Sequence, residues 1–282
     1  MALDVLIKNG WVVDGRGNPS PYRPWESLDV GVKDGKIVMM RPGIDVEADR
    51  VIDASERIVA PGIIDVHSHS DGYLMENPRA ESSVRQGITT CVVGNCGLSA
   101  APVYNGFRPA SSILPGKIPY NWTTMDEYFR VLEKDGLSLN MVALVGHCNL
   151  RAAGMDFRQG KPNAEEMAFM KKVLRESLDA GCWGMSIGLI YPPAYFSGSE
   201  ELVELLRIIA DYGGVNHVHV RGQGENLIAA IREAIATAEE AGAPVHIHHH
   251  KGMGDANAPK IKITLRLLED AILRGMTVSL DM

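Results

Sequence analysis

Short apolar runs separated by polar turn residues occupy the first 60 residues of the chain. Asn9-Gly10 interrupts an early run, and Asp34-Gly35 lies between apolar stretches at 28–32 and 36–40. Asp-Gly between two such stretches predicts a tight hairpin, because both residues accept the positive φ angles that the turn requires. No helix-period pattern of useful length occurs there. Residues 1–60 are therefore predicted to form a small β domain.

The hydrophobic pattern changes at residue 61, where short apolar runs begin to alternate with amphipathic helical stretches. Strands are expected at residues 63–66, 89–93, 141–145, 184–187, 215–220, 245–248 and 277–280. Helices are expected most clearly at residues 164–180, 200–211, 227–241 and 263–273. This alternation predicts a parallel sheet, either doubly wound or closed into a barrel.

Two features of residues 61–282 favour a barrel. Candidate chemical residues lie at the carboxyl ends of several strands, where barrel enzymes place their sites. No Gly-x-Gly-x-x-Gly follows the first strand, so a dinucleotide crevice is unsupported. Six full strands and a seventh near the end of the sequence predict an α/β fold with an incomplete (β/α)8 barrel.

Composition and charge narrow the class of protein. The chain has 282 residues, 45% hydrophobic and 22% charged, with a net charge of -7. This acidic balance argues against a surface for nucleic acid or anionic membrane. No apolar stretch reaches the roughly 18 residues of a membrane span, and the first residues lack the pattern of a signal peptide. The four cysteines form no Cys-x-x-Cys pair, so a reducing cytoplasm is expected.

The strongest local signal for chemistry is a pair of histidines at the end of the first barrel strand. His67 and His69 follow an apolar run and Pro61-Gly62. Side chains two apart on a strand point the same way, so both imidazoles can reach one cation. We interpret this pair as metal-binding.

Cys96 is the second candidate ligand. It ends the second strand between Gly94 and Gly97, and a thiolate is a strong zinc ligand. The alternative is a buried structural thiol, the usual role of a cysteine. Cys91 lies on the opposite face if the strand stays regular, and it is expected in the core.

Histidines on later strands complete the candidate set. His219 is nearer the carboxyl end of its strand than His217, and is the better ligand; His217 is equally compatible with a hydrogen-bonded core histidine. His147 ends the third strand, and a contact with substrate or with a ligand is expected there rather than a bond to the metal.

The sixth strand reads Val-His-Ile-His-His-His-Lys from residue 245. Alternation places His249 and Lys251 on the face of Val245 and Ile247, and we expect this face to line the barrel. The other face carries the histidines at positions 246, 248 and 250 and is expected to pack on helices. The alternative, that this triple-histidine face binds the metal, stays open.

Together these residues resemble the D-aminoacylase (N-acyl-D-amino-acid deacylase) family of the amidohydrolase superfamily. The matching stretches include residues 60–71, 87–102, 181–192 and 247–251. Any one of them alone is weak, but Gly94-Asn95-Cys96-Gly97 together with Gly188-Leu189-Ile190-Tyr191 is specific. The resemblance implies a (β/α)8 barrel beside a small β-sandwich built from both chain ends, of which residues 1–60 would be the N-terminal part.

The same resemblance implies a zinc centre and a substrate site. Cys96, His219 and His249 match the ligands of a tightly held zinc, and His67 and His69 match a second, weaker position. Tyr191 and Lys251 match residues that bind the substrate's carboxylate. The fourth strand has no lysine to bridge two metals, so Cys96 would take that role.

The implied reaction is hydrolysis of the amide bond of a small N-acyl amino acid, with no nucleic-acid or membrane partner. The family's proton-transferring aspartate would lie beyond residue 282, and Asp281 is assigned to a seventh-strand motif instead. The 282-residue chain is therefore expected to be an inactive fragment. Two alternatives remain: a cyclic-amide hydrolase of the dihydroorotase or hydantoinase type, and a non-catalytic metal-binding remnant.

Overall fold

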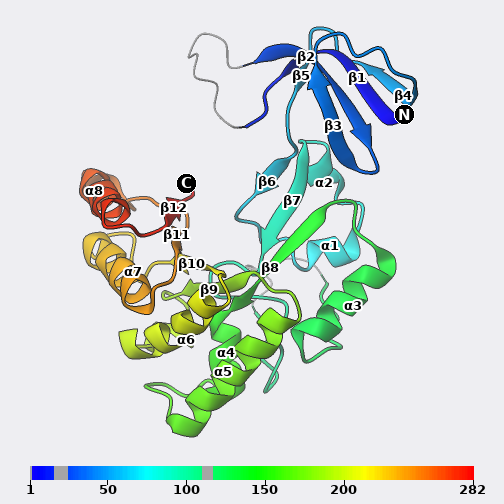
Figure 1. The fold of residues 1–282 in the computed structure, drawn as a ribbon. Coiled ribbons are helices and arrows are strands. Elements are labelled where there is room, and N and C mark those ends of the chain that lie inside the picture. Colours follow the sequence, from blue (N-terminus) through cyan, green and yellow to red (C-terminus); the bar gives the residue numbers. More distant parts are fainter. Residues whose placement is uncertain (1, 16–24, 110–116) are drawn as a thin grey trace. The chain divides into compact units, whose positions relative to one another are not determined.

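A computed structural model describes residues 2–15, 25–109 and 117–282 of the chain (Figure 1). The chain divides into two compact units, Met1–Ile63 and Ile64–Met282. Each unit has its own sheet, and each is described by itself below.

The first unit is a five-stranded sheet in the order β3-β2-β1-β4, with β5 also paired to β1. Its strands are β1 (Leu3–Val12), β2 (Glu26–Lys33), β3 (Lys36–Arg41), β4 (Ala48–Asp53) and β5 (Ile58–Val59). The hairpin at Asp34-Gly35 is confirmed, because β2 and β3 pair antiparallel and the turn residues have φ angles of 51° and 69°. The interpretation of Asn9-Gly10 as a break is wrong. Asn9, with a φ of 63°, lies in a bulge inside one continuous strand.

The second unit contains a seven-stranded sheet in which the strands follow chain order from β6 to β12 (Figure 1). The strands are β6 (Ile63–Asp65), β7 (Ile88–Val93), β8 (Asn140–Gly146), β9 (Gly184–Gly188), β10 (Val215–His219), β11 (Val245–Ile247) and β12 (Val278–Leu280). The pairs from β7 to β12 are parallel. All seven strands lie where the hydrophobic pattern predicts them. A strand order that never reverses is that of a barrel wall, whereas a doubly wound sheet has a switch point.

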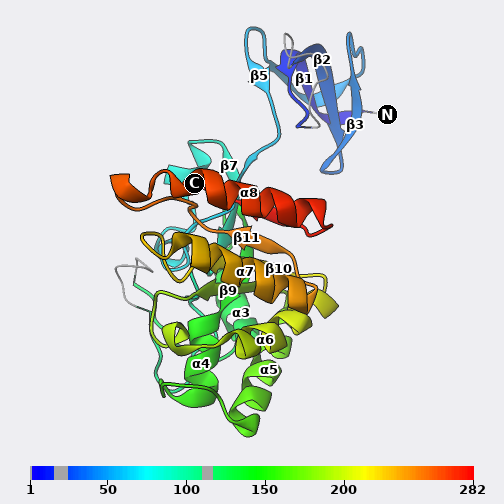
Figure 2. The same ribbon diagram turned by 90° about the vertical axis from the view of Figure 1, so that its left-hand side faces the viewer.

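The helices connect the strands on one side of this sheet. They are α1 (Tyr73–Glu76), α2 (Glu81–Val84), α3 (Met125–Asp135), α4 (His147–Met155), α5 (Ala164–Asp179), α6 (Ser199–Asp211), α7 (Leu227–Ala241) and α8 (Lys260–Leu273), with 3-10 helices at Ala194–Phe196 and Asp255–Asn257. The helices α5 to α8 pack in chain order, as Figure 2 shows. None of the helices in the described ranges is both long and apolar enough to cross a membrane.

The four predicted helices are confirmed. The sequence analysis did not predict α3 and α4. Helix α3 has a capping box in which the Thr124 side chain accepts from the Glu127 amide and Glu127 reaches back, so its start was readable from the sequence. Helix α4 is buried on nearly every side. It therefore lacks the amphipathic period by which a surface helix is recognised.

Packing against the helices decides which face of each strand points inward. Met185, Ile187, Val218, Val245 and Ile247 belong to the hydrophobic core that the strands share with α5, α6 and α7. The residues of opposite parity, including Ser186, His217 and His246, therefore line the inner face.

The expected faces of the sixth strand are consequently reversed for β11. His246 pairs in register with His217 on β10, and both are on the inner face. His248 is also inside, because its Nε2 lies 3.1 Å from His217 Nδ1. The apolar Val245 and Ile247 pack outward because the helices offer them an apolar surface. His250 contacts a helix, with its Nε2 2.9 Å from Thr264 Oγ1 of α8.

Candidate metal centre

The carboxyl ends of β6, β7 and β11 bring three histidines around one cysteine. Cys96 Sγ lies 3.3 Å from His67 Nε2, 3.7 Å from His248 Nδ1 and 3.7 Å from His249 Nε2. One donor atom from each of these four residues lies within 4.8 Å of every other, which is close enough for a shared cation. This group is called the Cys96 cluster below.

The two remaining predicted ligands lie at the border of this cluster. His219 Nδ1 is 2.9 Å from His249 Nε2, and the rings of His67 and His69 have centroids 5.4 Å apart. His69 Nδ1 and His219 Nε2 are buried and have no hydrogen-bond partner. A buried ring nitrogen without a hydrogen-bond partner destabilises the folded protein. A bound cation would provide the missing partner, because the nitrogen lone pair can coordinate it.

His248 is a member of the cluster that the sequence prediction placed elsewhere. The regular strand β11 ends at Ile247, and His249 has a φ of 34°. The chain therefore stops alternating, so the side chains of His248 and His249 both reach Cys96. His248 was misplaced because the inner face of the strand was assigned wrongly, whereas the loss of alternation after Ile247 is what brings His249 to the same side.

Burial sets the protonation of the donors. Desolvation lowers the pKa of His69 to about 4, of His219 to about 3 and of His249 to about 4, with further lowering by neighbouring positive charge. Desolvation and the charge of Asp281 raise the pKa of the Cys96 thiol to about 12. These three imidazoles are therefore neutral with lone pairs available, and a cation would stabilise the thiolate form of Cys96.

Asp281, which follows the end of β12, contacts two residues of the Cys96 cluster, His67 and His249. Its Oδ2 lies 3.0 Å from both His67 Nδ1 and His246 Nε2, and its Oδ1 accepts from the backbone amide of His249. Burial alone would raise the pKa of Asp281, but hydrogen bonds from His246 and His67 hold it well below its usual range. A carboxylate on His67 Nδ1 leaves Nε2 free to face Cys96.

The turn that carries Cys96 requires glycine at defined positions. Cys96 itself has a φ of 56°, and Gly97 has a φ of 77°. A Cβ at Gly97 would lie 2.5 Å from the backbone nitrogen of Gly188, and one at Gly188 would lie 2.0 Å from the Cys96 carbonyl oxygen. Ser186 Oγ accepts a hydrogen bond from the Gly97 backbone amide, at 2.9 Å. The glycines therefore let the turn after β7 approach the end of β9 closely enough to place Cys96.

Tyr191 and Lys251 lie near the cluster. The Tyr191 ring packs edge-on against His219 with centroids 5.1 Å apart. Lys251 is exposed, and its positive charge lowers the pKa values of Cys96, His219 and His249. Both residues therefore lie beside the predicted ligands.

His147 does not join the cluster. Its Nε2 lies 2.7 Å from Glu201 Oε1, and Arg151 Nη1 pairs with Glu201 Oε2. All three residues are buried. The expected role of His147 beside the substrate or the ligands is therefore replaced by a buried ion cluster between α4 and α6.

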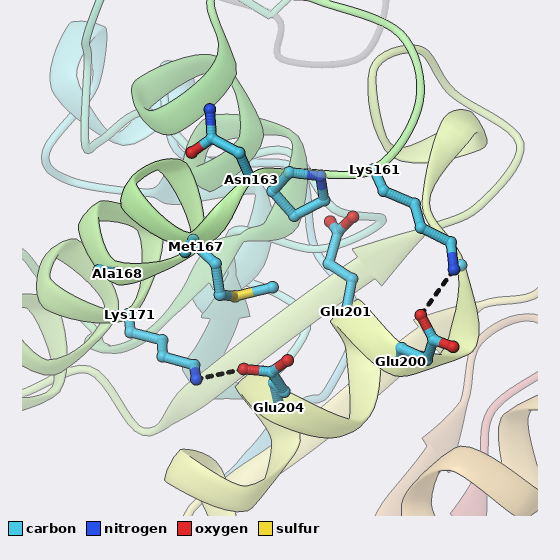
Figure 3. A pocket seen from close by; sticks show the side chains of 11 residues that line it. Lys161, Asn163, Met167, Ala168, Lys171, Glu200, Glu201 and Glu204 are labelled. Atoms are coloured by element: carbon cyan, nitrogen blue, oxygen red, sulfur yellow. Dashed lines mark hydrogen bonds and ion pairs between the residues drawn. The ribbon is translucent and has the colours of Figure 1, made fainter.

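A cavity of about 430 Å³ opens beside this ion cluster, between the first turns of α5 and α6 (Figure 3). Its charged side chains pair with one another: Lys161 Nζ lies 2.6 Å from Glu200 Oε2, and Lys171 pairs with Glu204. None of the predicted site residues lines it. It offers no unpaired charge that would point to a ligand among the side chains shown.

Comparison with known proteins gives a consistent picture. A model of the amidohydrolase family matches residues 50–277. An N-acyl-D-glutamate deacylase from Alcaligenes xylosoxydans xylosoxydans is 39% identical over 280 residues, which is 99% of this chain and 56% of the relative. A D-aminoacylase from the same organism is 36% identical over 99% of this chain and 57% of its own length.

Solved structures show the same likeness. An N-acyl-D-glutamate deacylase from Bordetella bronchiseptica, in complex with zinc and a phosphonate that mimics the tetrahedral intermediate, superposes with a TM-score of 0.93 at 35% identity. The match covers 100% of this chain and 58% of that one. The chain thus spans a little over half the length of these relatives. A D-hydantoinase matches with a TM-score of 0.61 at 20% identity, which shows the fold alone. The predicted amidohydrolase barrel is confirmed.

Proposed function

The chain belongs to the amidohydrolase family, and from that premise we propose that its Cys96 cluster is the zinc centre of an enzyme that hydrolyses N-acyl-D-amino acids. The observation that carries the proposal is the convergence of Cys96, His67 and His249 from three strand ends, with His219 beside them. The relatives named for N-acyl-D-glutamate and D-amino-acid deacylation match nearly the whole chain.

The donor set suits zinc in particular. A thiolate and neutral imidazoles are the ligands that zinc prefers. Cys96, His219 and His249 would hold the tight ion, and His67 and His69 a second, weaker one, with His248 as a further nitrogen in reach of Cys96. Bound zinc would bring the pKa of a water molecule towards ~7 and polarise the scissile carbonyl.

The chain's own residues would bind and orient the substrate. Lys251 carries an exposed positive charge beside the cluster, which suits the α-carboxylate of an N-acyl amino acid. Tyr191, against His219, would contact the same carboxylate. Asp281 is a positioning residue rather than the proton carrier, because its two oxygens already accept from His67, His246 and the His249 amide.

Zinc content is the direct test of the centre. We expect purified protein to retain zinc and Cys96→Ser to lose the tightly held ion, because a hydroxyl is a much weaker ligand than a thiolate. Cys182→Ser is the matched control, since Cys182 is also buried but lies in the hydrophobic core. Equal zinc contents in the two variants, measured by elemental analysis, would show that Cys96 is no ligand.

Activity assays separate the proposed reaction from its alternatives. The protein that carries these residues should release free amino acid from N-acetyl-D-glutamate or N-acetyl-D-methionine faster than from their L isomers. Ring opening of hydantoin in place of this activity would favour a cyclic-amide hydrolase. The absence of a lysine that could bridge two metals on β9 (Gly184–Gly188) argues against that alternative. Bound zinc without any turnover would favour a non-catalytic remnant.

A further inference from the structure

Two more histidines, His217 and His246, gather with His248 of the Cys96 cluster on the inner face of the sheet. His217 on β10 pairs in register with His246 on β11, and His248 follows on the same side. One ring nitrogen from each lies within 4.8 Å of the other two, and all three residues are buried. The donors of this group are nitrogens alone.

The geometry of the three rings suits a cation. His217 Nδ1 and His248 Nε2 are 3.1 Å apart, close to the separation of two ligands on one small divalent ion. The ring centroids of His217 and His246 are 4.3 Å apart. Asp281 Oδ2, 3.0 Å from His246 Nε2, supplies a negative charge at the edge of the group.

We propose that His217, His246 and His248 form a second, nitrogen-only binding site for a borderline divalent cation such as zinc, nickel or copper. Imidazole suits these ions, whereas calcium and magnesium require oxygen ligands. The proposal is independent of the amide hydrolysis argued above, because none of the three residues belongs to the ligand set matched by the family resemblance.

His248 connects this site to the Cys96 cluster. Its Nε2 faces His217, and its Nδ1 lies 3.7 Å from Cys96 Sγ. With Nε2 on a cation, Nδ1 carries the proton and donates to the sulfur, which stabilises the thiolate without a shared imidazolate. His246 gives up one of its two hydrogen bonds, to Ser279 Oγ or to Asp281, when it binds. The two sites are therefore joined through the ring of His248, whose Nε2 faces one site and whose Nδ1 faces the other.

Cobalt(II) titration of the purified protein distinguishes the sites, because cobalt bound to thiolate gives a sulfur-to-metal charge-transfer band that nitrogen ligands lack. We expect His246→Gln to bind one equivalent of cobalt less than the unchanged protein and to keep the charge-transfer band. Cys96→Ser should lose that band and keep the nitrogen-only equivalent. His250→Gln is the matched control, since His250 contacts Thr264 instead of the group, and its titration should be unchanged.

Equal cobalt stoichiometry in the unchanged protein and in His246→Gln would overturn the proposal, and the intact charge-transfer band would leave the Cys96 centre standing. The converse result, no charge-transfer band but a nitrogen-only equivalent lost in His246→Gln, would count against the zinc centre and support this site. If circular dichroism shows that His246→Gln is unfolded, His217→Asn gives the same comparison with the same two outcomes.

Discussion

At the scale of single residues, Glu201 is a buried carboxylate that its neighbours keep ionised. Burial alone would raise the pKa of Glu201, but a hydrogen bond from His147 and the positive charge of Arg151 lower it below its ordinary value. Arg151 is fully buried, and its other contact is the Gly160 carbonyl, 2.8 Å from Nη2. The stability of α4 against α6 therefore depends on Glu201 staying ionised.

We predict that Glu201→Gln destabilises the fold by about 3–5 kcal/mol at pH 7, because Arg151 is left as an uncompensated buried charge. A carboxylate whose folded pKa is lowered contributes stability above its unfolded pKa and loses it as the pH falls through the folded value. The difference from the unchanged protein should therefore shrink below about pH 4. Urea unfolding at several pH values measures it.

The control for this prediction is Glu200→Gln on the same helix turn. Glu200 pairs with Lys161 in solvent, with side chains 78% and 71% exposed, and surface pairs of this kind contribute little. A loss of stability as large for Glu200→Gln as for Glu201→Gln would contradict the role of the buried ion cluster.

At the scale of elements, the turn after β7 is defined by its contact with the end of β9. Gly97 combines a φ of 77° with a backbone neighbour, Gly188, that leaves no room for a side chain. The glycine pattern around Cys96 is thus a requirement of strand packing as well as of the turn. A change here moves the thiol, because Cys96 precedes Gly97 directly.

We predict that Gly97→Ala destabilises the fold and also lowers metal content. The left-handed conformation costs about 1–2 kcal/mol for any residue other than glycine, and forcing a methyl group against backbone adds about 1–3 kcal/mol. Gly242→Ala is the matched control, since Gly242 ends α7 with a φ of 70° and nothing within 4 Å of the added Cβ. Thermal unfolding and zinc analysis of both variants test this. Equal losses of stability, with zinc content unaffected, would mean that the approach to Gly188 is unimportant.

At the scale of the whole molecule, the second unit has a sheet with two edges in the described residues. In the order β12-β11-β10-β9-β8-β7-β6, the strands β6 and β12 each have one neighbour. Ile63 and Ile64 of β6 are 55% and 59% exposed. An open edge with exposed apolar residues is a template for pairing with another chain.

We therefore predict that the 282-residue polypeptide self-associates through β6 as its concentration rises, and that Ile64→Lys reduces this association. Trp183→Lys is the control, because Trp183 is 63% exposed but precedes β9 in the middle of the sheet. Size-exclusion chromatography with light scattering gives the masses. A monomer at all concentrations, or equal effects of the two substitutions, would show that the edge is not the contact.

The sequence by itself determined the strands and the four predicted helices, and it pointed to His67, His69, Cys96 and His219 as candidate ligands. Alternation with period two places His217 and His219 on one face of their strand, and apolar runs ending in polar residues locate the strand ends. Both signals are local, because they depend on neighbours only a few residues away. The Cys96 turn is readable for the same reason, through its glycines.

Only the tertiary structure decided which face of β11 is inside, that His248 reaches Cys96, and that His147 pairs with Glu201. Parity relates residues within one strand, but the choice of inner face depends on the helices that cover the other side. The contact between His67 and Asp281 joins residues 214 positions apart. No local pattern specifies such a contact, because it exists only after the sheet has brought β6 and β12 together around the cluster.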